Sequence, residues 1–187
     1  MTARPQDISF AVISEEGISP QLDRTIRETL VVCFPADCEY YQRQSWWHCV
    51  PEYRVLGRST EGSIAAHTAV VGRKVIVGPG LSEVRVAGIQ SFCILPGYRG
   101  TGLANKMMSA AMEEANKRGF DAGLLFCRER LELFYSRMGW RKLDAAVYMT
   151  DEKEGKTLIP ARNITMFYPL KVRQFPSGHI DLAGADW

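Results

Sequence analysis

The chain lacks the features that direct proteins to membranes or to nucleic acid. No apolar run approaches the roughly 20 residues that a membrane-spanning helix needs. With 23 Lys and Arg against 21 Asp and Glu, the net charge is only +2, and no block of basic residues is present. Residues 1–7 have neither the apolar segment of a secretory signal nor an Arg/Ser-rich transit pattern. We therefore expect a cytoplasmic protein with no nucleic acid and no membrane among its partners.

Cysteine is scarce and irregularly spaced. The cysteines number five, and an odd number without regular spacing argues against a disulfide framework. The cysteines around His48 match no standard zinc spacing, so we expect no metal. Two cysteines lie in apolar runs, where a free thiol behaves as a small hydrophobe. We expect reduced, structural thiols at Cys33, Cys38, Cys49, Cys93 and Cys127.

What is present is the composition of an ordinary globular protein: 187 residues, 46% hydrophobic and 24% charged. That length is sufficient for a sizeable core. No repeat, low-complexity segment or linker divides the chain. We therefore expect one α/β domain over residues 1–187.

A glycine-rich stretch, residues 95–104, lies between an apolar segment and an amphipathic run. Residues 84–95 are typical of a buried strand, and the helical pattern extends to Lys117. Gly100 and Gly102 permit a tight turn and close backbone approach. Free N–H groups and the positive end of the helix dipole would then face the same space. The pattern predicts an anion site suited to a pyrophosphate.

The other elements predict an antiparallel meander followed by a helical crossover. Strands with short turns are expected at 53–57, 63–77 and 84–95, and the second of these is expected to break near residues 72–73. A right-handed crossover would set 121–127 parallel to 84–95. The remaining expected elements are strands at 8–13, 140–149 and 163–170 and helices at 20–33 and 128–138.

Two motifs resemble those of the GCN5-related N-acetyltransferase (GNAT) superfamily. The stretch Arg99-Gly100-Thr101-Gly102-Leu103-Ala104 fits the Q/R-x-x-G-x-G/A signature, and Tyr135 to Trp140 resembles the Y-x-x-x-G-F/W element. A glycine loop alone is weak evidence, but two motifs in the expected order of elements are much stronger. The resemblance implies an α/β GNAT fold: a mixed, mostly antiparallel sheet with a splayed parallel pair of central strands, flanked by helices.

The same resemblance implies an acyl-CoA site and direct acyl transfer. Tyr135 would be the general acid that protonates the leaving thiolate, because a phenol pKa of about 10 is near that of a thiol. A core tyrosine with a satisfied hydroxyl is the alternative. Strand amides would pair with pantetheine and polarise the thioester carbonyl. The residues implied for binding acetyl-CoA or another acyl-CoA are Phe92, Cys93, Ile94, Arg99, Gly100, Thr101, Gly102, Leu103 and Ala104.

A narrower resemblance points to amino-sugar acceptors. Segments similar to the nodulation-factor N-acyltransferases lie at 51–57, 62–67, 73–77 and 176–184, and segments similar to the aminoglycoside 2′-N-acetyltransferases lie at 64–67, 135–140 and 184–187. Both groups of enzymes act on amino sugars. The implied acceptor pocket contains Gln90, Trp46, Asp186 and Trp187.

The chain departs from both groups at the expected base. Gln90 stands where the aminoglycoside enzymes carry a Glu, and no carboxylate lies near Gly88, where the nodulation enzymes place one. An amide does not usefully accept a proton, so the base is absent or elsewhere. A water chain to bulk is one option, and for His67 a satisfied strand histidine is an equal alternative. The candidates for the base are His67, Asp181, Asp186 and the Trp187 carboxylate.

The sequence thus predicts an enzyme that moves an acetyl group from acetyl-CoA to a primary amine of a small amino sugar or aminoglycoside-like molecule. Asp181 and Asp186 would attract a cationic acceptor. The oligomeric state stays open, with a homodimer as one option.

Two alternatives accompany this prediction. A long-chain acyltransferase with an acyl carrier protein donor would need an apolar groove, although methionines at helical spacing are more often core. A non-catalytic acyl-CoA sensor is the other alternative. The candidates for the groove are Trp46, Trp47, Phe92, Met107 and Met108.

Overall fold

The structure, a computed structural model, describes residues 8–151 and 153–187. The expectation for residues 1–7 therefore lies outside the described residues. No helix in the described part is both long and apolar enough to cross a membrane. The helices are α1 (Pro20–Cys33), α2 (Cys38–Arg43), α3 (Leu103–Lys117) and α4 (Glu132–Ser136). The strands are β1 (Ser9–Ser14), β2 (Tyr53–Arg58), β3 (Ile64–Val77), β4 (Ser82–Ile94), β5 (Ala122–Arg128), β6 (Arg141–Leu143), β7 (Val147–Asp151), β8 (Gly155–Leu158), β9 (Asn163–Pro169) and β10 (Ile180–Asp181).

The strands form a mixed, mostly antiparallel sheet. Hydrogen bonds link them in the order β6-β9-β5-β4-β3-β10-β7-β8, and β2 pairs with both β1 and β3. The expected parallel pairing of β4 with β5 is confirmed, with Val86 opposite Ala122 and Gly88 opposite Leu124. Each of the pairs β1–β2, β2–β3 and β5–β9 is antiparallel. The predicted α/β class with a mixed sheet and helices is therefore confirmed.

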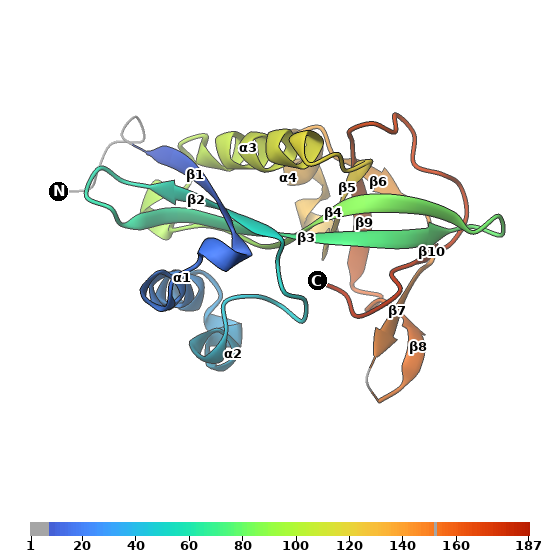
Figure 1. Cartoon of the computed structure of the whole chain (residues 1–187), viewed down its shortest axis with the longest axis horizontal. Helices are drawn as coiled ribbons and strands as arrows, with labels where there is room; N and C mark the ends of the chain where they lie inside the picture. The colour runs from blue at the N-terminus through green and yellow to red at the C-terminus, as the bar shows by residue number, and fades with distance from the viewer. Residues whose placement is uncertain (1–7, 152) are drawn as a thin grey trace. The chain divides into compact units, whose positions relative to one another are not determined.

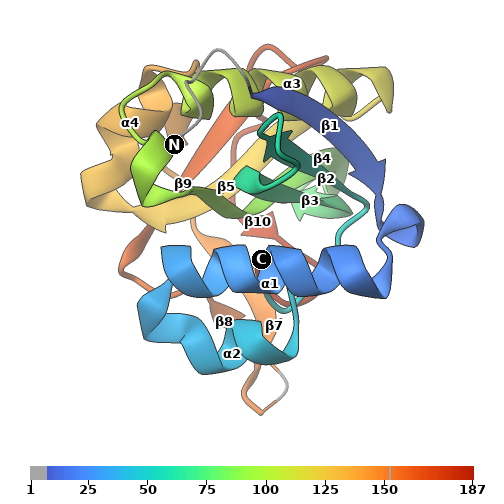
Figure 2. The ribbon, with the colours of Figure 1, turned by 90° about the vertical axis from the view of Figure 1, so that its left-hand side faces the viewer.

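The chain divides into two compact units, to which β3, β4 and α3 each contribute residues. Unit 1 comprises the chain up to Val70 together with Gln90–Glu114. Unit 2 comprises Val71–Ile89 and Ala115–Trp187. Within unit 1, α3 lies on one side of the strands, and α1 and α2 lie on the other (Figures 1 and 2).

Helix α1 begins and ends at the predicted residues. The Ser19 hydroxyl accepts a hydrogen bond from Leu22 N–H at 3.2 Å, and Pro20 occupies the first turn. Ile26 and Leu30 are fully buried in a cluster with residues of α2, β2, β3 and β4. Burial of each side chain contributes about 1.5–3 kcal/mol, so packing rather than propensity holds α1 on the strands of unit 1.

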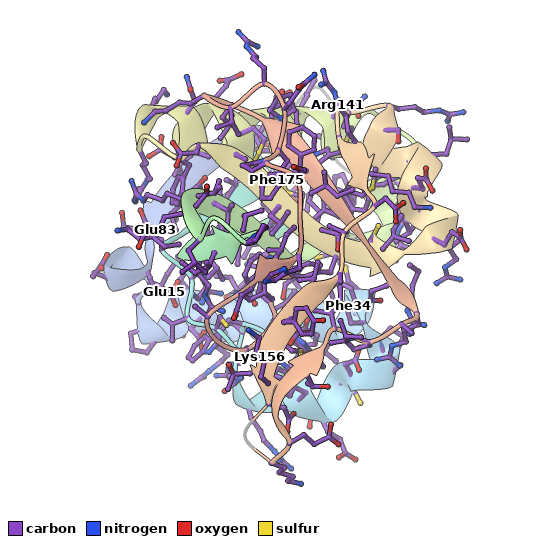
Figure 3. All side chains as sticks on the ribbon, turned by 90° about the vertical axis from the view of Figure 1, so that its right-hand side faces the viewer. Glu15, Phe34, Glu83, Arg141, Lys156 and Phe175 are labelled. Carbon is purple, nitrogen blue, oxygen red and sulfur yellow. The ribbon has the colours of Figure 1, made fainter. Side chains whose placement is uncertain are left out.

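In unit 2, β9 lies between β5 and β6, and β7 and β8 form a hairpin. The Phe167 ring of β9 lies 5.9 Å from the Arg141 guanidinium and 5.7 Å from the Phe175 ring (both labelled in Figure 3). These contacts pack part of the irregular segment after β9 against the sheet.

Three secondary-structure predictions were wrong, and two short strands were not predicted. β3 is unbroken at residues 72–73, where the Arg73 side chain is bonded to the C-terminal segment. The expected strand 140–149 is two strands, because β6 pairs with β9 whereas β7 pairs with β8 and β10. The second helix has only five regular residues, Glu132–Ser136, and the left-handed Gly139 follows it. β8 and β10 were not expected, since the first is polar and exposed and the second has two residues.

Candidate active site

The glycine-rich stretch forms the entry to α3 in unit 1. After a 3₁₀ turn at Pro96–Tyr98, Gly100 and Gly102 adopt φ values of +75° and +81°. A Cβ at either glycine would meet nothing within 4 Å, so the loop is open on that side. Lys106 N–H bonds to Gly102 O at 3.4 Å as the helix begins, and the N–H groups of residues 103–105 therefore have no intrahelical acceptor. Such amides at a helix N-terminus are suited to bind an anion.

Side chains of the same stretch hold it in place. Thr101 Oγ1 donates to the Tyr98 carbonyl oxygen at 2.6 Å. Arg99 Nε donates to the Ile94 carbonyl oxygen at 3.0 Å, which ties the loop to the end of β4. Both bonds fix the path of the stretch before α3.

Within β4, Ser91 has a left-handed backbone conformation with φ of +50°. A non-glycine residue there is strained, and neighbouring groups must hold it. The Ser91 hydroxyl lies 3.1 Å from the Tyr41 hydroxyl, and the Ser91 carbonyl oxygen accepts from His67 Nδ1 at 3.0 Å. Two side chains from different elements therefore fix the strand immediately before Phe92, Cys93 and Ile94. The sequence pattern gave no signal of this arrangement.

His67 is fully buried, and its tautomer follows from its partner. Because a carbonyl oxygen only accepts, Nδ1 carries the proton and Nε2 is the bare nitrogen. Among the described residues Nε2 has no hydrogen-bond partner. Burial, with a smaller contribution from the Arg54 charge, lowers the pKa of His67 from 6.5 to about 3. These features favour a neutral, positioning histidine over a base.

Both polar atoms of the Gln90 side-chain amide are hydrogen-bonded within the protein. Its Nε2 donates to the Cys49 carbonyl oxygen at 2.7 Å, and its Oε1 accepts from Trp47 N–H. Thr68 Oγ1 donates to the Gln90 carbonyl oxygen at 3.3 Å. The side chain is only 3% exposed. Gln90 therefore clamps the segment 47–49 onto β4, a role that a carboxylate could not fill because it lacks the donor.

The aromatic residues before β2 form a cluster rather than an open groove. The Tyr40 and Trp47 rings lie 4.6 Å apart, and the Trp46 ring lies 6.0 Å from the guanidinium of the buried Arg54. Arg54 is itself paired with Glu15 at 2.6 Å. Met107 and Met108, which were candidates for an apolar groove, are fully buried core residues of α3. Both methionines are therefore core residues, as their helical spacing favours, and they do not line a groove.

Tyr135 lies in α4 of unit 2 and is 8% exposed. Its ring contacts Phe134 at 5.0 Å and Trp140 at 6.3 Å, both edge-on. Burial first, and the nearby Cys127 second, raise the pKa of Tyr135 well above 10. The phenol is therefore protonated at neutral pH.

The C-terminal residues pack into unit 2. The Trp187 ring lies 5.1 Å from Phe126 and 5.4 Å from the Arg73 guanidinium, which also donates to the Ala185 carbonyl oxygen. A Cβ at Gly88 would come within 2.3 Å of the Trp187 ring. The space beside Gly88 of β4 is thus filled by an indole.

The two candidate aspartates differ in their surroundings. Asp181 pairs with Lys156 at 2.5 Å and accepts from Ala183 N–H at 2.8 Å. The hydrogen bond from Lys156, followed by that from Ala183, holds the pKa of Asp181 below its usual value. A carboxylate held in this way is a poor base. Asp186 is 9% exposed beside Trp187.

The structure therefore brings the candidates together in two groups. Unit 1 holds the glycine loop, Phe92 to Ile94, His67, Gln90 and Trp46, whereas unit 2 holds Tyr135, Asp181, Asp186 and Trp187. Tyr41, Ser91 and Arg73 were missed because their partners are distant in sequence. In the part of the chain that the structure describes, no three His, Cys, Asp or Glu side chains are grouped as metal ligands.

Comparison with solved structures supports the fold. The structure is similar to that of YhbS, a GNAT family N-acetyltransferase from Escherichia coli in complex with CoA, with a TM-score of 0.64 and 15% identity over 98% of this chain and 92% of that one. It is also similar to Escherichia coli ElaA, with a TM-score of 0.61 and 14% identity over 86% and 99%. An acyl-CoA N-acyltransferase from Pseudomonas aeruginosa gives a TM-score of 0.60 and 14% identity over 86% and 99%.

Sequence comparison supplies the family. None of the curated proteins matches the chain. The profile of the acetyltransferase (GNAT) domain, however, matches residues 23–143, which is more than half of the sequence. That range contains the glycine loop, β4, α3, β5 and Tyr135. The chain therefore belongs to the GNAT acetyltransferase family.

Proposed function

We propose that this GNAT acetyltransferase moves an acetyl group from acetyl-CoA to a primary amine of a small amino sugar or aminoglycoside-like molecule, by direct attack of the amine on the thioester. The observation that carries the proposal is the fixed left-handed Ser91 in β4, followed within the same unit by the open glycine loop. The first can present strand amides to a thioester, and the second can bind a pyrophosphate.

The donor would be held by backbone rather than by side chains. The amides of residues 100–105 would bind the pyrophosphate. The backbone of Phe92, Cys93 and Ile94 would pair with the pantetheine arm and polarise the thioester carbonyl. An amide aimed at a developing oxyanion stabilises it without reorganisation, because its position is already set by His67 and Tyr41.

Proton transfer would need a donor for the thiolate and a route away from the amine. Tyr135 is our candidate donor, because its phenol is protonated at neutral pH. Burial raises the pKa of this phenol above that of a thiol, so its proton would pass to the thiolate less readily than from an exposed tyrosine. For the amine, two of the candidate bases are poorly suited: His67 is buried and bonded to the Ser91 carbonyl oxygen, and Asp181 is paired with Lys156. We therefore favour loss of the amine proton through water to bulk.

The amino-sugar acceptor rests on the sequence resemblance and on charge. Asp186 lies beside Trp187 in unit 2, and an acidic group next to an aromatic ring suits a cationic, ring-shaped acceptor. Gln90, His67 and Asp181 are each bonded to other groups of the protein, so none of them is placed to act as a base. This favours one second candidate, a sensor that binds acyl-CoA without turnover.

A donor and acceptor panel separates these possibilities. The purified chain is incubated with acetyl-CoA or a longer acyl-CoA and a series of aminoglycosides and amino sugars, and free CoA is measured with a thiol reagent against reactions lacking acceptor. Transfer is expected with acetyl-CoA, and Tyr135→Phe is expected to slow it roughly ten- to a thousandfold. Tyr148→Phe, on the solvent-accessible β7, serves as the matched control and should retain full activity.

The outcomes assign the function. Calorimetric binding of CoA without turnover of any amine would replace the enzyme with the sensor. Turnover only with a long-chain acyl carrier protein donor would replace acetyl transfer with long-chain transfer. Equal loss of activity in Tyr135→Phe and Tyr148→Phe would remove the acid role from Tyr135.

A further inference from the structure

Two cysteines of unit 1 lie side by side where α1 meets β4. Cys33 is the last residue of α1, and Cys93 is the last but one of β4. Cys93 belongs to the buried cluster between α1 and the strands, and Cys33 packs against that cluster. The two thiols are close enough that each shifts the pKa of the other. Cys33 is partly exposed, whereas Cys93 is only 6% exposed. Cys33 can thus be reached from solvent, whereas Cys93 is sheltered from it.

A fixed positive charge stands beside this pair. Arg99 is held at the end of β4 by its 3.0 Å hydrogen bond to the Ile94 carbonyl oxygen, and its guanidinium also bonds to the Cys33 sulfur. The hydrogen bond from Cys93, and after it the charge of Arg99, lower the pKa of Cys33 to about 7 against the opposing effect of burial. The pKa of Cys93 is raised because its thiol donates to Cys33 and is buried.

The two thiols therefore differ in their tendency to ionise. At neutral pH about half of the Cys33 groups would be thiolate, whereas a free thiol with a pKa near 8.5 is only a few per cent ionised. The thiolate is the nucleophile in cysteine oxidation, and a sensor cysteine typically has a second thiol beside it. Cys127 contrasts with this, since burial raises its pKa to about 11 and its thiol faces the Met166 sulfur at 3.9 Å.

We propose that Cys33 and Cys93 form a redox-sensitive dithiol that a hydroperoxide converts to a disulfide. The Cys33 thiolate attacks the peroxide, the O–O bond breaks, and Cys33 becomes a sulfenic acid while hydroxide leaves and takes up a proton. The Cys93 sulfur then attacks the Cys33 sulfur, the S–O bond breaks, and hydroxide leaves as water with the Cys93 proton. In total the two thiols lose two electrons and two protons, and hydrogen peroxide is reduced to two molecules of water.

The disulfide would also affect acetyl transfer, a consequence that rests on the proposed function. Closing the bond requires the sulfurs to approach, which moves the Cys93 backbone within the segment expected to hold pantetheine. Sub-ångström to ångström shifts in such segments cost up to about a hundredfold in rate. We expect transfer to fall at least about tenfold on oxidation and to return with dithiothreitol.

Mass spectrometry of the intact chain tests the dithiol without any measurement of activity. The reduced protein is exposed to hydrogen peroxide, quenched with N-ethylmaleimide and mapped by proteolysis. We expect a two-dalton loss, a crosslinked peptide pair containing Cys33 and Cys93, and reversal by dithiothreitol. Alkylation of both cysteines after peroxide treatment, or a crosslink of Cys33 to Cys38 or to a second chain, would overturn the proposal.

Three variants sharpen the assignment. Cys38→Ser, which removes a partly exposed thiol outside the pair, should retain the crosslink. Cys93→Ser should trap Cys33 as a sulfenic acid that dimedone labels, and Cys33→Ser should leave Cys93 reduced. Dimedone labelling of Cys38 ahead of Cys33 would contradict the proposal. An inactive transferase that still forms the crosslink would refute the proposed function and leave the dithiol standing.

Discussion

The carbonyl oxygen of Ser91 lies 3.0 Å from Nδ1 of His67, on a strand residue whose φ is +50°. On its side-chain face the same serine is bonded to Tyr41, whose burial raises its pKa to about 12 and keeps it a neutral phenol. A strained residue held by two buried, neutral side chains is pre-organised rather than flexible. Histidine and tyrosine therefore serve here to shape a backbone, and their ionisation would weaken it.

Acid should destabilise the protein through His67. Its pKa is about 3 in the folded state and about 6.5 when unfolded, so below pH 6.5 the unfolded chain binds a proton that the folded chain refuses. Stability from this group is complete above pH 6.5 and is lost as the pH falls toward 3, with a slope of at most about 1.4 kcal/mol per pH unit. Urea unfolding of wild type and His67→Asn at pH 7, 6 and 5 measures it.

The difference between the two proteins should shrink as the pH falls, because the variant lacks the titrating ring. His179→Asn is the matched control, since His179 is exposed in unit 2. That variant should follow the wild-type profile. If the free energy of unfolding of His67→Asn changes with pH as that of the wild type does, His67 is protonated in the folded state. The neutral tautomer that we assign to it would then be wrong.

Replacing Gln90 with the carboxylate that its position lacks should harm the protein rather than improve it. In Gln90→Glu the donor to the Cys49 carbonyl oxygen is lost, and a buried carboxylate would face that oxygen. We expect a loss of about 1–3 kcal/mol in the free energy of unfolding at pH 8. The loss should be smaller at pH 5, because burial raises the pKa of the introduced carboxyl and the protonated group can donate again.

Chemical unfolding at the two pH values checks this, alongside acetyl-transfer assays. Gln42→Glu, at an exposed position of α2, is the control for the added charge and should change little at either pH. A Gln90→Glu variant that is stable at pH 8 and faster in transfer would show that the position accepts a general base, against our assignment of Gln90 as a clamp.

The regular elements of the fold were predictable because their signals are local. Ser19 and Pro20 mark the start of α1, and the apolar spacing of α3 is visible over 15 residues. β10 carries no such signal. Its two residues are extended because they pair with β3 on one side and β7 on the other, and only the folded chain brings those partners together.

In the candidate site, too, features with a local sequence signal were predictable and features that depend on distant partners were not. The glycine loop was predictable from spacing, because positive φ at Gly100 and Gly102 is a local demand. The clamp by Gln90 was not, since its partners Trp47 and Cys49 lie about forty residues earlier and bond through their backbones. An interaction through main-chain atoms does not depend on the residue type of the partner. The sequence therefore shows that position 90 carries no carboxylate, but not that Gln90 holds the 47–49 segment.

Adding a methyl group should weaken CoA binding at Gly100 but not at Gly97, because only Gly100 has a positive φ. Gly100→Ala places a Cβ on a residue at φ +75°, which costs about 1–2 kcal/mol unless the loop turns its amides away. We expect calorimetry to show CoA binding weakened about five- to thirtyfold. Gly97→Ala has equal space around its Cβ and no positive φ, so its affinity should stay within about twofold of wild type. Equal effects in both variants would remove the loop conformation from donor binding.

The close approach of Gly88 to Trp187 predicts a strong steric coupling in unit 2. An alanine Cβ at Gly88 would lie 2.3 Å from the Trp187 ring, so the indole must leave its place between Phe126 and Arg73. We expect Gly88→Ala to lower the free energy of unfolding by about 1–3 kcal/mol, as overpacked sites do. Chemical unfolding followed by circular dichroism measures the loss.

A double-mutant cycle tests whether the indole is the cause. In the Trp187→Leu background a smaller side chain leaves room for the methyl group, so Gly88→Ala should cost less there than in wild type, with a coupling of at least about 0.5 kcal/mol. Gly80→Ala, where a Cβ meets nothing within 4 Å, is the matched control and should be nearly neutral. If Gly88→Ala costs the same in both backgrounds, the indole does not fill the space beside β4.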